Sequence, residues 1–142
     1  SQSELISYGH DIEAAWLLVE AAKTTKNNLL IENAKKANVL IAEVFLKEGY
    51  QIDKGILNEK NLKTGEVDTD RHWWPQVEAM VGLDYAWRIS GNKEFLEAKY
   101  NIWSFTKKHL IDRKNGEWFF RIDCNNSPYA KEDKLSMWKA PY

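Results

Sequence analysis

The sequence predicts an all-α fold of stacked helical hairpins. Four segments carry apolar residues at helical spacing, and they alternate between segments that are apolar on nearly every side and segments with one polar face. We interpret this alternation as inner helix, outer helix, inner helix, outer helix. The two inner segments also share a short match, because Ile-Glu-Ala-Ala at 12–15 aligns with Val-Glu-Ala-Met at 77–80. Two hairpins leave a large inner surface open, which an α/α toroid closes with further hairpins, so we expect part of such a toroid.

The first hairpin joins a buried helix to an amphipathic one. Its inner helix is predicted from about residue 10 to 22, because only Glu13 is polar between Ile12 and Val19. Its outer helix is predicted from about residue 28 to 47, with Lys and Glu on its polar side. The apolar stripe predicted for this outer helix consists of Leu30, Ala34, Ala37, Ile41, Val44 and Phe45.

The second hairpin repeats this arrangement. Its inner helix is predicted from about residue 75 to 89, with Pro75 at the first helical position, where no backbone N–H is needed. A Ser-Gly-Asn turn at 90–92 separates it from an outer helix predicted from about residue 93 to 110. The apolar stripe of that helix consists of Phe95, Ala98, Ile102 and Phe105.

Turn-rich stretches follow each outer helix, at residues 63–66 and 113–117. An Asn-Gly pair at 115–116 is a strong hairpin signal, and it predicts a short strand at 118–122. From Ser127 onward, prolines and a run of charges predict a loop. We therefore expect short β-hairpins in the loops of a helical fold.

Composition excludes several classes of protein. The chain has 142 residues, enough for one domain, and a formal net charge of -1 without a basic stripe, so we expect no nucleic-acid partner. No apolar run is long enough to span a membrane, and the residues after Ser1 do not resemble a signal peptide. The single cysteine, Cys124, suits a reducing compartment, so we expect a cytoplasmic protein. Because metal-binding motifs and phosphate-cradling glycine runs are missing, we expect neither a metal nor a cofactor.

Two glutamates and one histidine are the first candidates for chemistry. Glu13 and Glu78 each lie early in an apolar helix, where a carboxylate is costly to bury unless it has a partner. The alternative is that each is exposed at a helix N-terminus and stabilised by the helix dipole. His10 lies one turn before Glu13, so the two could form a proton-transfer pair, although the pattern alone favours a capping or packing role. His72, in a polar turn, and His109, at the end of an outer helix, are weaker candidates.

Aromatic content is the most unusual feature of the composition. The chain has seven Trp, six Tyr and five Phe. Large aromatic side chains usually build a core, and we interpret most of them in this way. The alternative is that some tryptophans line a groove, since sugar-binding sites place flat apolar faces against the CH face of a pyranose.

Three motifs in order carry a family resemblance. The stretch at 7–18 (SYGHDIEAAWLL) resembles a signature of cellobiose 2-epimerases, and 73–82 (WWPQVEAMVG) and 138–142 (WKAPY) also resemble the family. A family-like Gly-Glu-Trp-Phe segment at 116–119 lies between the last two. On these motifs, the whole chain is identified as similar to the N-acylglucosamine 2-epimerase and cellobiose 2-epimerase family.

The resemblance implies a ring of six helical hairpins, (α/α)6, of which residues 1–142 would be the C-terminal portion of a single epimerase domain. It implies that the N-terminal part, with an active-site Arg, and the extreme C-terminus are absent. The family motif that reaches Tyr142 continues into a second catalytic His, which this sequence does not contain. We therefore expect the chain alone to lack appreciable activity and to self-associate through its open inner face.

The resemblance also implies roles for individual residues. A His would remove the C2 proton of the ring-opened sugar, next to the C1 carbonyl, and a second His would reprotonate the enediolate on the opposite face. By position, His10 corresponds to one member of that pair, and Glu13 and Glu78 would hydrogen-bond the substrate or orient the His. The residues expected to contact the substrate are Asp11 and three tryptophans that would form aromatic walls, Trp16, Trp74 and Trp138.

The expected substrate is a β-1,4-linked disaccharide such as cellobiose or mannobiose. The alternatives are an N-acylglucosamine 2-epimerase, or a carbohydrate-binding or glycosidase-like α/α module in which Glu13 and Glu78 act as the carboxylate pair. A non-enzymatic helical scaffold would leave His10 and the two inner glutamates unexplained.

Overall fold

Four helices and seven short strands make up the computed structural model, which describes residues 4–129 and 131–139. The helices are α1 (Tyr8–Thr24), α2 (Asn28–Glu48), α3 (Trp73–Ser90) and α4 (Lys93–His109). The strands are β1 (Leu5–Ser7), β2 (Tyr50–Gln51), β3 (Gly55–Ile56), β4 (Glu59–Asn61), β5 (Val67–Asp68), β6 (Arg71–His72) and β7 (Arg121–Ile122). The expected all-α class, with small strand pairs in the loops, is confirmed.

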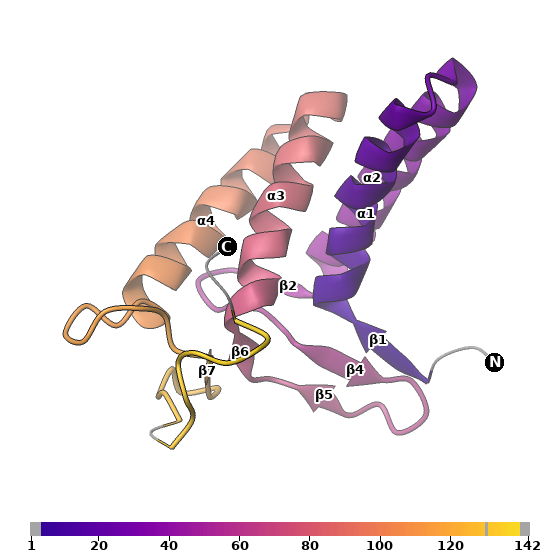
Figure 1. Cartoon of the computed structure of the whole chain (residues 1–142). Helices are drawn as coiled ribbons and strands as arrows, with labels where there is room; N and C mark the ends of the chain where they lie inside the picture. The colour runs from indigo at the N-terminus through magenta and orange to yellow at the C-terminus, as the bar shows by residue number, and fades with distance from the viewer. Residues whose placement is uncertain (1–3, 130, 140–142) are drawn as a thin grey trace.

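The helices form two hairpins that pack side by side. Helix α1 packs against α2 and α3, and α3 packs against α4. In Figure 1, α1 and α3 are neighbours in one layer, and α2 and α4 lie behind them. This is the alternation of inner and outer helices that the sequence predicts, with α1 and α3 as the inner pair.

The inner helices approach each other closely at Gly82. A Cβ added at Gly82 would lie 2.6 Å from Cγ1 of Ile12 and 2.8 Å from its carbonyl oxygen, so a glycine is needed at this crossing. Small residues continue the contact, since Ala15, Ala79 and Ala86 are fully buried. The short distance between α1 and α3 allows side chains from the two helices to reach one another.

The outer helices bury faces that agree only partly with the predicted stripes. The α4 stripe is confirmed, because all four of its residues are buried. In α2, Ala34 and Phe45 are buried as predicted, but Leu30 and Val44 are 45% and 53% exposed. The predicted α2 stripe was therefore wrong at these positions, because it joined the core face to the outward side of the helix. The buried positions of α2 are Ala34, Asn38, Ala42 and Phe45.

The helix ends follow local chemistry. Helices α2 and α4 begin after Asn27 and Asn92, whose side-chain oxygens accept the N–H groups of Leu30 and Glu94. Helix α3 begins two residues before Pro75, the predicted start. A third-position proline is tolerated because none of the first four N–H groups of a helix has an intrahelical partner.

The strands gather at the end of the molecule where the inner helices begin (Figure 1). Strands β1, β4 and β5 form an antiparallel sheet, with Ile6 opposite Lys60 and Lys60 opposite Val67. Strands β2 and β3 form a second antiparallel pair, and β6 pairs with β7. Strands β2 to β6 lie in the connection from α2 to α3, β1 comes directly before α1, and β7 follows α4.

The strand predicted at 118–122 is shorter than expected. Only Arg121–Ile122 forms a strand, and it pairs with β6 instead of folding back across the Asn-Gly turn. An isolated bridge between Ile111 and Trp118 spans that turn. The side chain of Asp112 accepts the backbone N–H groups of residues 114 and 115, which gives a longer loop than a two-residue hairpin.

The C-terminal segment is irregular from Ser127 onward, as predicted, in residues 127–129 and 131–139. Its last described residue, Lys139, is buried, and its ammonium group lies 3.2 Å from a carboxylate oxygen of Glu117 and 5.6 Å from the ring centroid of Trp73. The segment is therefore anchored beside the start of α3. Within the described ranges, no helix is long and apolar enough to cross a membrane, and no group of three or more potential metal ligands is present.

Candidate active site

The first turns of the inner helices bring His10 and Trp74 together. Their ring centroids are 4.7 Å apart, with the planes tilted by 49°. Gly9 makes this contact possible, because an added Cβ would lie 2.7 Å from Cζ3 of Trp74. The structure therefore places an imidazole against the face of an indole at the N-terminal end of the inner pair, on the side where the loops gather.

His10 is exposed, and its Nδ1 atom is 2.8 Å from the hydroxyl oxygen of Ser7. Because the ring uses Nδ1 for this contact, Nε2 remains available for proton transfer. In the tautomer in which Nδ1–H donates to Ser7, Nε2 carries a lone pair and is a base. The hypothesis that His10 is the cap of α1 is wrong, since Ser7 is the residue that precedes the first residue of α1. A packing role for His10 is compatible with proton transfer.

Glu78 lies within α3 and is only 5% exposed. The indole Nε1–H of Trp16 donates to its Oε2 atom at 2.9 Å, so α1 supplies a hydrogen-bond donor to a carboxylate of α3. Burial raises the pKa of Glu78, the Trp16 hydrogen bond opposes that rise, and the charge of Glu13 adds to it. The alternative that Glu78 is exposed at a helix N-terminus is therefore wrong.

Glu13 is half-buried on α1, one turn after His10, and its charge acts on Glu78. The two inner glutamates that the sequence singles out are thus electrostatically coupled. Like charges in a partly desolvated site raise the pKa of one partner, which suits proton transfer or strong hydrogen bonding to a ligand. The His10–Trp74 pair and the group of Glu13, Glu78 and Trp16 all lie in the N-terminal halves of α1 and α3, and we call these five residues the cluster.

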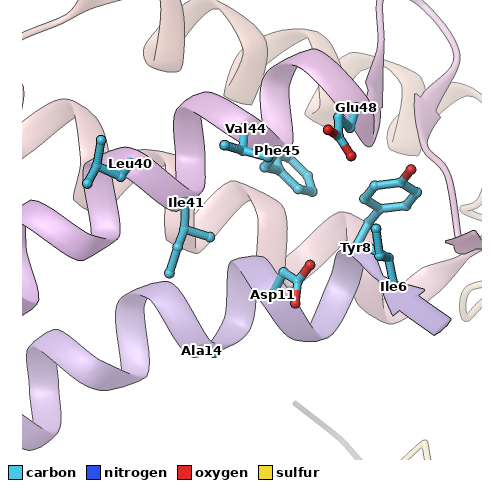
Figure 2. Close-up of a pocket in the computed structure, with 9 residues that line it drawn as sticks. All are labelled: Ile6, Tyr8, Asp11, Ala14, Leu40, Ile41, Val44, Phe45 and Glu48. Atoms are coloured by element: carbon cyan, nitrogen blue, oxygen red, sulfur yellow. The ribbon is translucent and has the colours of Figure 1, made fainter. Parts of the chain in front are cut away.

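Asp11 lies apart from this cluster. It lines a groove of about 410 Å³ between α1 and α2, together with Tyr8, Leu40, Val44 and Glu48 among others (Figure 2). Burial raises the pKa of Asp11, His10 lowers it and Glu48 raises it. Neighbours on a helix are rotated by about 100° from each other, so Asp11 turns toward α2 while His10 contacts α3.

Trp138 is 77% exposed in the C-terminal segment. Its backbone N–H donates to the hydroxyl of Ser136 at 3.2 Å, and its neighbour Lys139 is anchored at the start of α3. Among the described residues, none of the contacts found joins its ring to His10 or Glu78. The aromatic wall expected from Trp138 therefore stays a prediction.

The other two histidines lie outside the cluster. His72 precedes α3, its pKa is lowered chiefly by burial, and its Nε2 finds no hydrogen-bond partner among the described residues. His109 packs on Phe105 with ring centroids 4.9 Å apart. Neither has a contact with His10 among those found within the described residues, and their lower rank as candidates stays a prediction.

Gln76 is a residue of the site region to which the sequence assigned no structural role. Its fully buried amide accepts the N–H of Ile56 at 2.9 Å and donates to the carbonyls of Ile56 and His72. It thereby ties β3 to the first turn of α3, which also carries Trp74. The sequence signal for this role was the position of a polar amide between the apolar residues Pro75 and Val77 in the first turn of a buried helix.

Comparison with known proteins identifies the class. Residues 3–138 match the family model described as N-acylglucosamine 2-epimerase, and the members of this family are carbohydrate 2-epimerases, a class of isomerase. Because the match covers nearly the whole chain, this chain belongs to the N-acylglucosamine 2-epimerase family.

Relatives of known activity cover the same range. The chain is 41% identical over 142 residues to the cellobiose 2-epimerase of Bacteroides fragilis, covering 100% of this chain and 36% of that protein. It is 28% identical over 120 residues to the N-acylglucosamine 2-epimerase of Rattus norvegicus, covering 78% of this chain and 27% of that protein. The chain therefore spans about a third of the length of the curated relatives it matches.

Solved structures show the same arrangement of helices. A sugar epimerase from a ruminal bacterium superimposes with a TM-score of 0.91 at 30% identity, over 99% of this chain and 36% of that one. The cellobiose 2-epimerase of Bacillus thermoamylovorans superimposes with a TM-score of 0.90 at 36% identity, over 100% of this chain and 36% of that one. The two hairpins are thus a recurring part of a larger sugar epimerase fold.

Proposed function

We propose that this chain is the C-terminal portion of an (α/α)6 sugar 2-epimerase and carries one of its two proton-transfer groups, His10. The observation that carries the proposal is the cluster at the start of the inner helices. There an exposed imidazole packs on Trp74, one turn from a coupled pair of carboxylates, Glu13 and Glu78. An imidazole, a flat apolar surface and buried acceptors are what C2 proton transfer on a sugar requires.

The chemistry proceeds through an enediolate. After the sugar ring opens, Nε2 of His10 removes the C2 proton, and the electron pair of the C2–H bond moves into a C1–C2 double bond while the C1 carbonyl oxygen takes up negative charge. Return of a proton to the opposite face of C2 gives the epimer. Glu13 and Glu78 hydrogen-bond the sugar hydroxyls and Trp74 supports the carbon skeleton, so the reacting carbon is held within reach of the imidazole.

Delivery of the second proton needs a group on the opposite face. His72 and His109 lie away from the cluster, so we propose that the second imidazole and the remaining hairpins belong to the portion of the relatives' length that this chain does not span. On this proposal, the 142 residues alone bind sugar weakly and do not epimerise it at an appreciable rate. Losing one general acid or base costs about 10²–10⁴ in rate, and loss of the enclosing hairpins adds to that cost.

We propose a β-1,4-linked disaccharide as the substrate. Supporting this choice, the relatives that cover essentially the whole chain at 34–41% identity are cellobiose 2-epimerases, whereas the N-acylglucosamine enzyme of the rat is 28% identical. Trp138 remains a proposed wall of the site, because the segment that carries it is anchored beside Trp73. Asp11 remains a proposed substrate contact only through its position next to His10.

A chimera tests the function with the residues of this chain. The aligned segment of the Bacteroides fragilis enzyme is replaced by this chain, and the product is incubated with cellobiose, mannobiose or N-acetylglucosamine in heavy water. We expect the C2 epimer of the disaccharides with deuterium at C2, and a rate about 10²–10⁴ lower for His10→Gln. His109→Gln is the matched control and should leave the rate unchanged.

Three results would contradict the proposal. Release of monosaccharides without C2 deuterium would favour the glycosidase-like alternative. Faster turnover of N-acetylglucosamine than of cellobiose would favour the N-acylglucosamine alternative. A folded chimera without turnover, checked by circular dichroism, together with a lack of cellobiose-induced shifts in the NMR spectrum of this chain, would overturn the assignment of the cluster as a sugar site.

A further inference from the structure

Trp16 makes a contact that a simple aromatic wall does not need. Its indole N–H donates to Oε2 of Glu78 at 2.9 Å, across the interface between α1 and α3. The ring is also restrained on another side, since its centroid lies 6.1 Å from that of Tyr85, whose hydroxyl donates to Glu20 at 2.6 Å. Tyr85, which is hydrogen-bonded to Glu20, thus packs beside the indole of Trp16, and the indole restrains the Glu78 carboxylate through its hydrogen bond.

We infer that Trp16 is a positioning residue that fixes the rotamer of Glu78 through the hydrogen bond from its indole N–H to Oε2 of this carboxylate. The inference deepens the proposed function, because it rests on Glu78 being a group that contacts the sugar. It changes the role expected for Trp16, from a surface that stacks on the ligand to a donor that acts through Glu78.

Two opposing influences make this donor important. Glu78 is 5% exposed and faces the charge of Glu13, and both conditions favour its neutral form. Trp16 is the hydrogen-bond donor found for the ionised form among the described residues, and an indole N–H can only donate. A donor-only partner hydrogen-bonds a carboxylate more strongly than the carbonyl oxygen of a protonated carboxyl group, and it cannot accept the carboxyl proton, so the contact favours the charged state.

The geometry leaves one oxygen for a ligand. The indole occupies Oε2, and no hydrogen bond to Oε1 is found among the described residues, nor does Oε1 belong to the fully enclosed atoms without a partner. Oε1 is therefore accessible and can accept a hydrogen bond from a sugar hydroxyl. A charged acceptor gives a stronger hydrogen bond than a neutral one.

The close approach at Gly82 sets the distance on which this contact depends. Ile12 and Gly82 are in van der Waals contact one turn away from Trp16 and Glu78 on each helix, and the crossing has no space for a Cβ at Gly82. The N–H of Trp16 therefore reaches the carboxylate without distortion of either helix. Phe at position 16 retains most of the apolar contact with Tyr85 and loses only the donor.

A titration of this chain tests the inference without any activity assay. The Glu78 carboxyl carbon is followed by ¹³C NMR against pH in the wild type and in Trp16→Phe, and the Trp16 indole N–H resonance is followed in parallel. We expect the indole resonance to move with the titration of Glu78, and the midpoint of that titration to rise in Trp16→Phe. Trp103→Phe, the same change on the exposed face of α4, should leave the midpoint unchanged.

Kinetics of the chimera separate positioning from simple support of the fold. Trp16→Phe should lower kcat by about ten- to a hundredfold, the loss of one hydrogen bond to a charged group, and should move the acidic limb of the pH profile upward. An unchanged Glu78 midpoint in Trp16→Phe overturns the inference, whatever the activity. If Trp16→Phe raises the Glu78 midpoint but the wild-type chimera lacks epimerase activity, the Trp16–Glu78 coupling is upheld. Only the proposed function is then overturned.

Discussion

Asn38 is a polar side chain enclosed by the helices on the core face of α2. It is fully buried, and neither its amide nitrogen nor its amide oxygen finds a hydrogen-bond partner among the described residues. Desolvating an amide without a partner costs about 1–3 kcal/mol. Because leucine has a similar size, we expect Asn38→Leu to raise the free energy of unfolding by about 1 kcal/mol, as measured by urea denaturation.

The control for this substitution lies on the same helix. Asn33 is exposed, so Asn33→Leu removes no buried amide without a partner. It should leave the free energy of unfolding within about 0.5 kcal/mol of the wild-type value. A clear loss of stability in Asn38→Leu, with Asn33→Leu neutral, would show that the amide has a partner in solution.

At this scale the sequence predicts which residues carry chemistry better than it predicts their partners. Glu13, Glu78 and His10 stand out because they are polar groups at or near the start of apolar helices. The contact between Trp16 and Glu78, which are 62 positions apart in the chain, could not be predicted, because it depends on the rotation and separation of two helices. Asp11 shows the same limit, since one step along the helix moves it to another surface.

The crossing of α1 and α3 gives a prediction at the scale of elements. We expect Gly82→Ala to lower the free energy of unfolding by about 1–3 kcal/mol, because the added methyl group overlaps the side chain and carbonyl of Ile12. This loss should exceed the gain in helix propensity of about 1 kcal/mol. Urea denaturation measures the stability, and the Trp16 indole resonance should shift as the helices separate.

The control for Gly82→Ala is a substitution at an exposed position of a helix. Asn33→Ala in α2 gains helix propensity without a clash and should be stabilising by a few tenths of a kcal/mol, roughly. If Gly82→Ala proved as stable as the wild type, the two helices would not be as closely packed as the crossing at Ile12 indicates.

The turn after α4 gives a pH-dependent prediction. Asp112 pairs with Lys134 and accepts N–H groups from residues 114 and 115, and these contacts hold its pKa well below the ordinary value for aspartate. A depressed pKa in the folded state gives stability that is present above the unfolded pKa of about 3.9 and is lost as pH falls further. We expect Tm to fall as pH drops from 5 toward 2.

The variant Asp112→Asn should have a lower Tm than the wild type at pH 7 and a smaller decrease in acid. Asp133→Asn is the control, because Asp133 is exposed in the same segment as Lys134. Parallel Tm curves for the wild type and Asp112→Asn between pH 5 and 2 would show that this carboxylate does not contribute to the acid sensitivity.

Elements differ in how far the sequence predicts them. All four helices lie within two residues of their predicted ends, because periodic apolar positions over many turns leave a strong pattern. The strands β2, β3, β5, β6 and β7 have two residues each, which is too short for alternation to be visible, and their pairing depends on the packing of the loops. The three-stranded sheet of β1, β4 and β5 was not predicted either, because its strands have only two or three residues.

At the scale of the whole molecule, the groove between α1 and α2 is an open edge of the row of helices. Leu40 and Val44 on α2 are 62% and 53% exposed, and Leu18 on α1 is 49% exposed. Exposed apolar patches promote association. We expect the isolated chain to self-associate through this edge, and the double variant Leu40→Lys, Val44→Lys to be largely monomeric in sedimentation velocity.

Leu29→Lys is the control for that double variant. Leu29 is 72% exposed at the start of α2 but does not line the groove. Equal association of the double variant and the wild type would place the contact elsewhere, such as the face of α1 and α3 that carries His10. A smaller effect of Leu29→Lys than of the double variant would localise it to the groove.

The anchored C-terminal segment has a consequence for the speed of ligand enclosure. Because Lys139 contacts Glu117 and Trp73, the backbone next to Trp138 is restrained, while the Trp138 side chain is largely exposed. The indole thus has a high effective concentration near the first turn of α3, and the entropy of bringing it there is lost on folding and not on binding. In the proposed site, enclosing a sugar would need only a side-chain rotation, which takes roughly picoseconds to nanoseconds, and not a loop search.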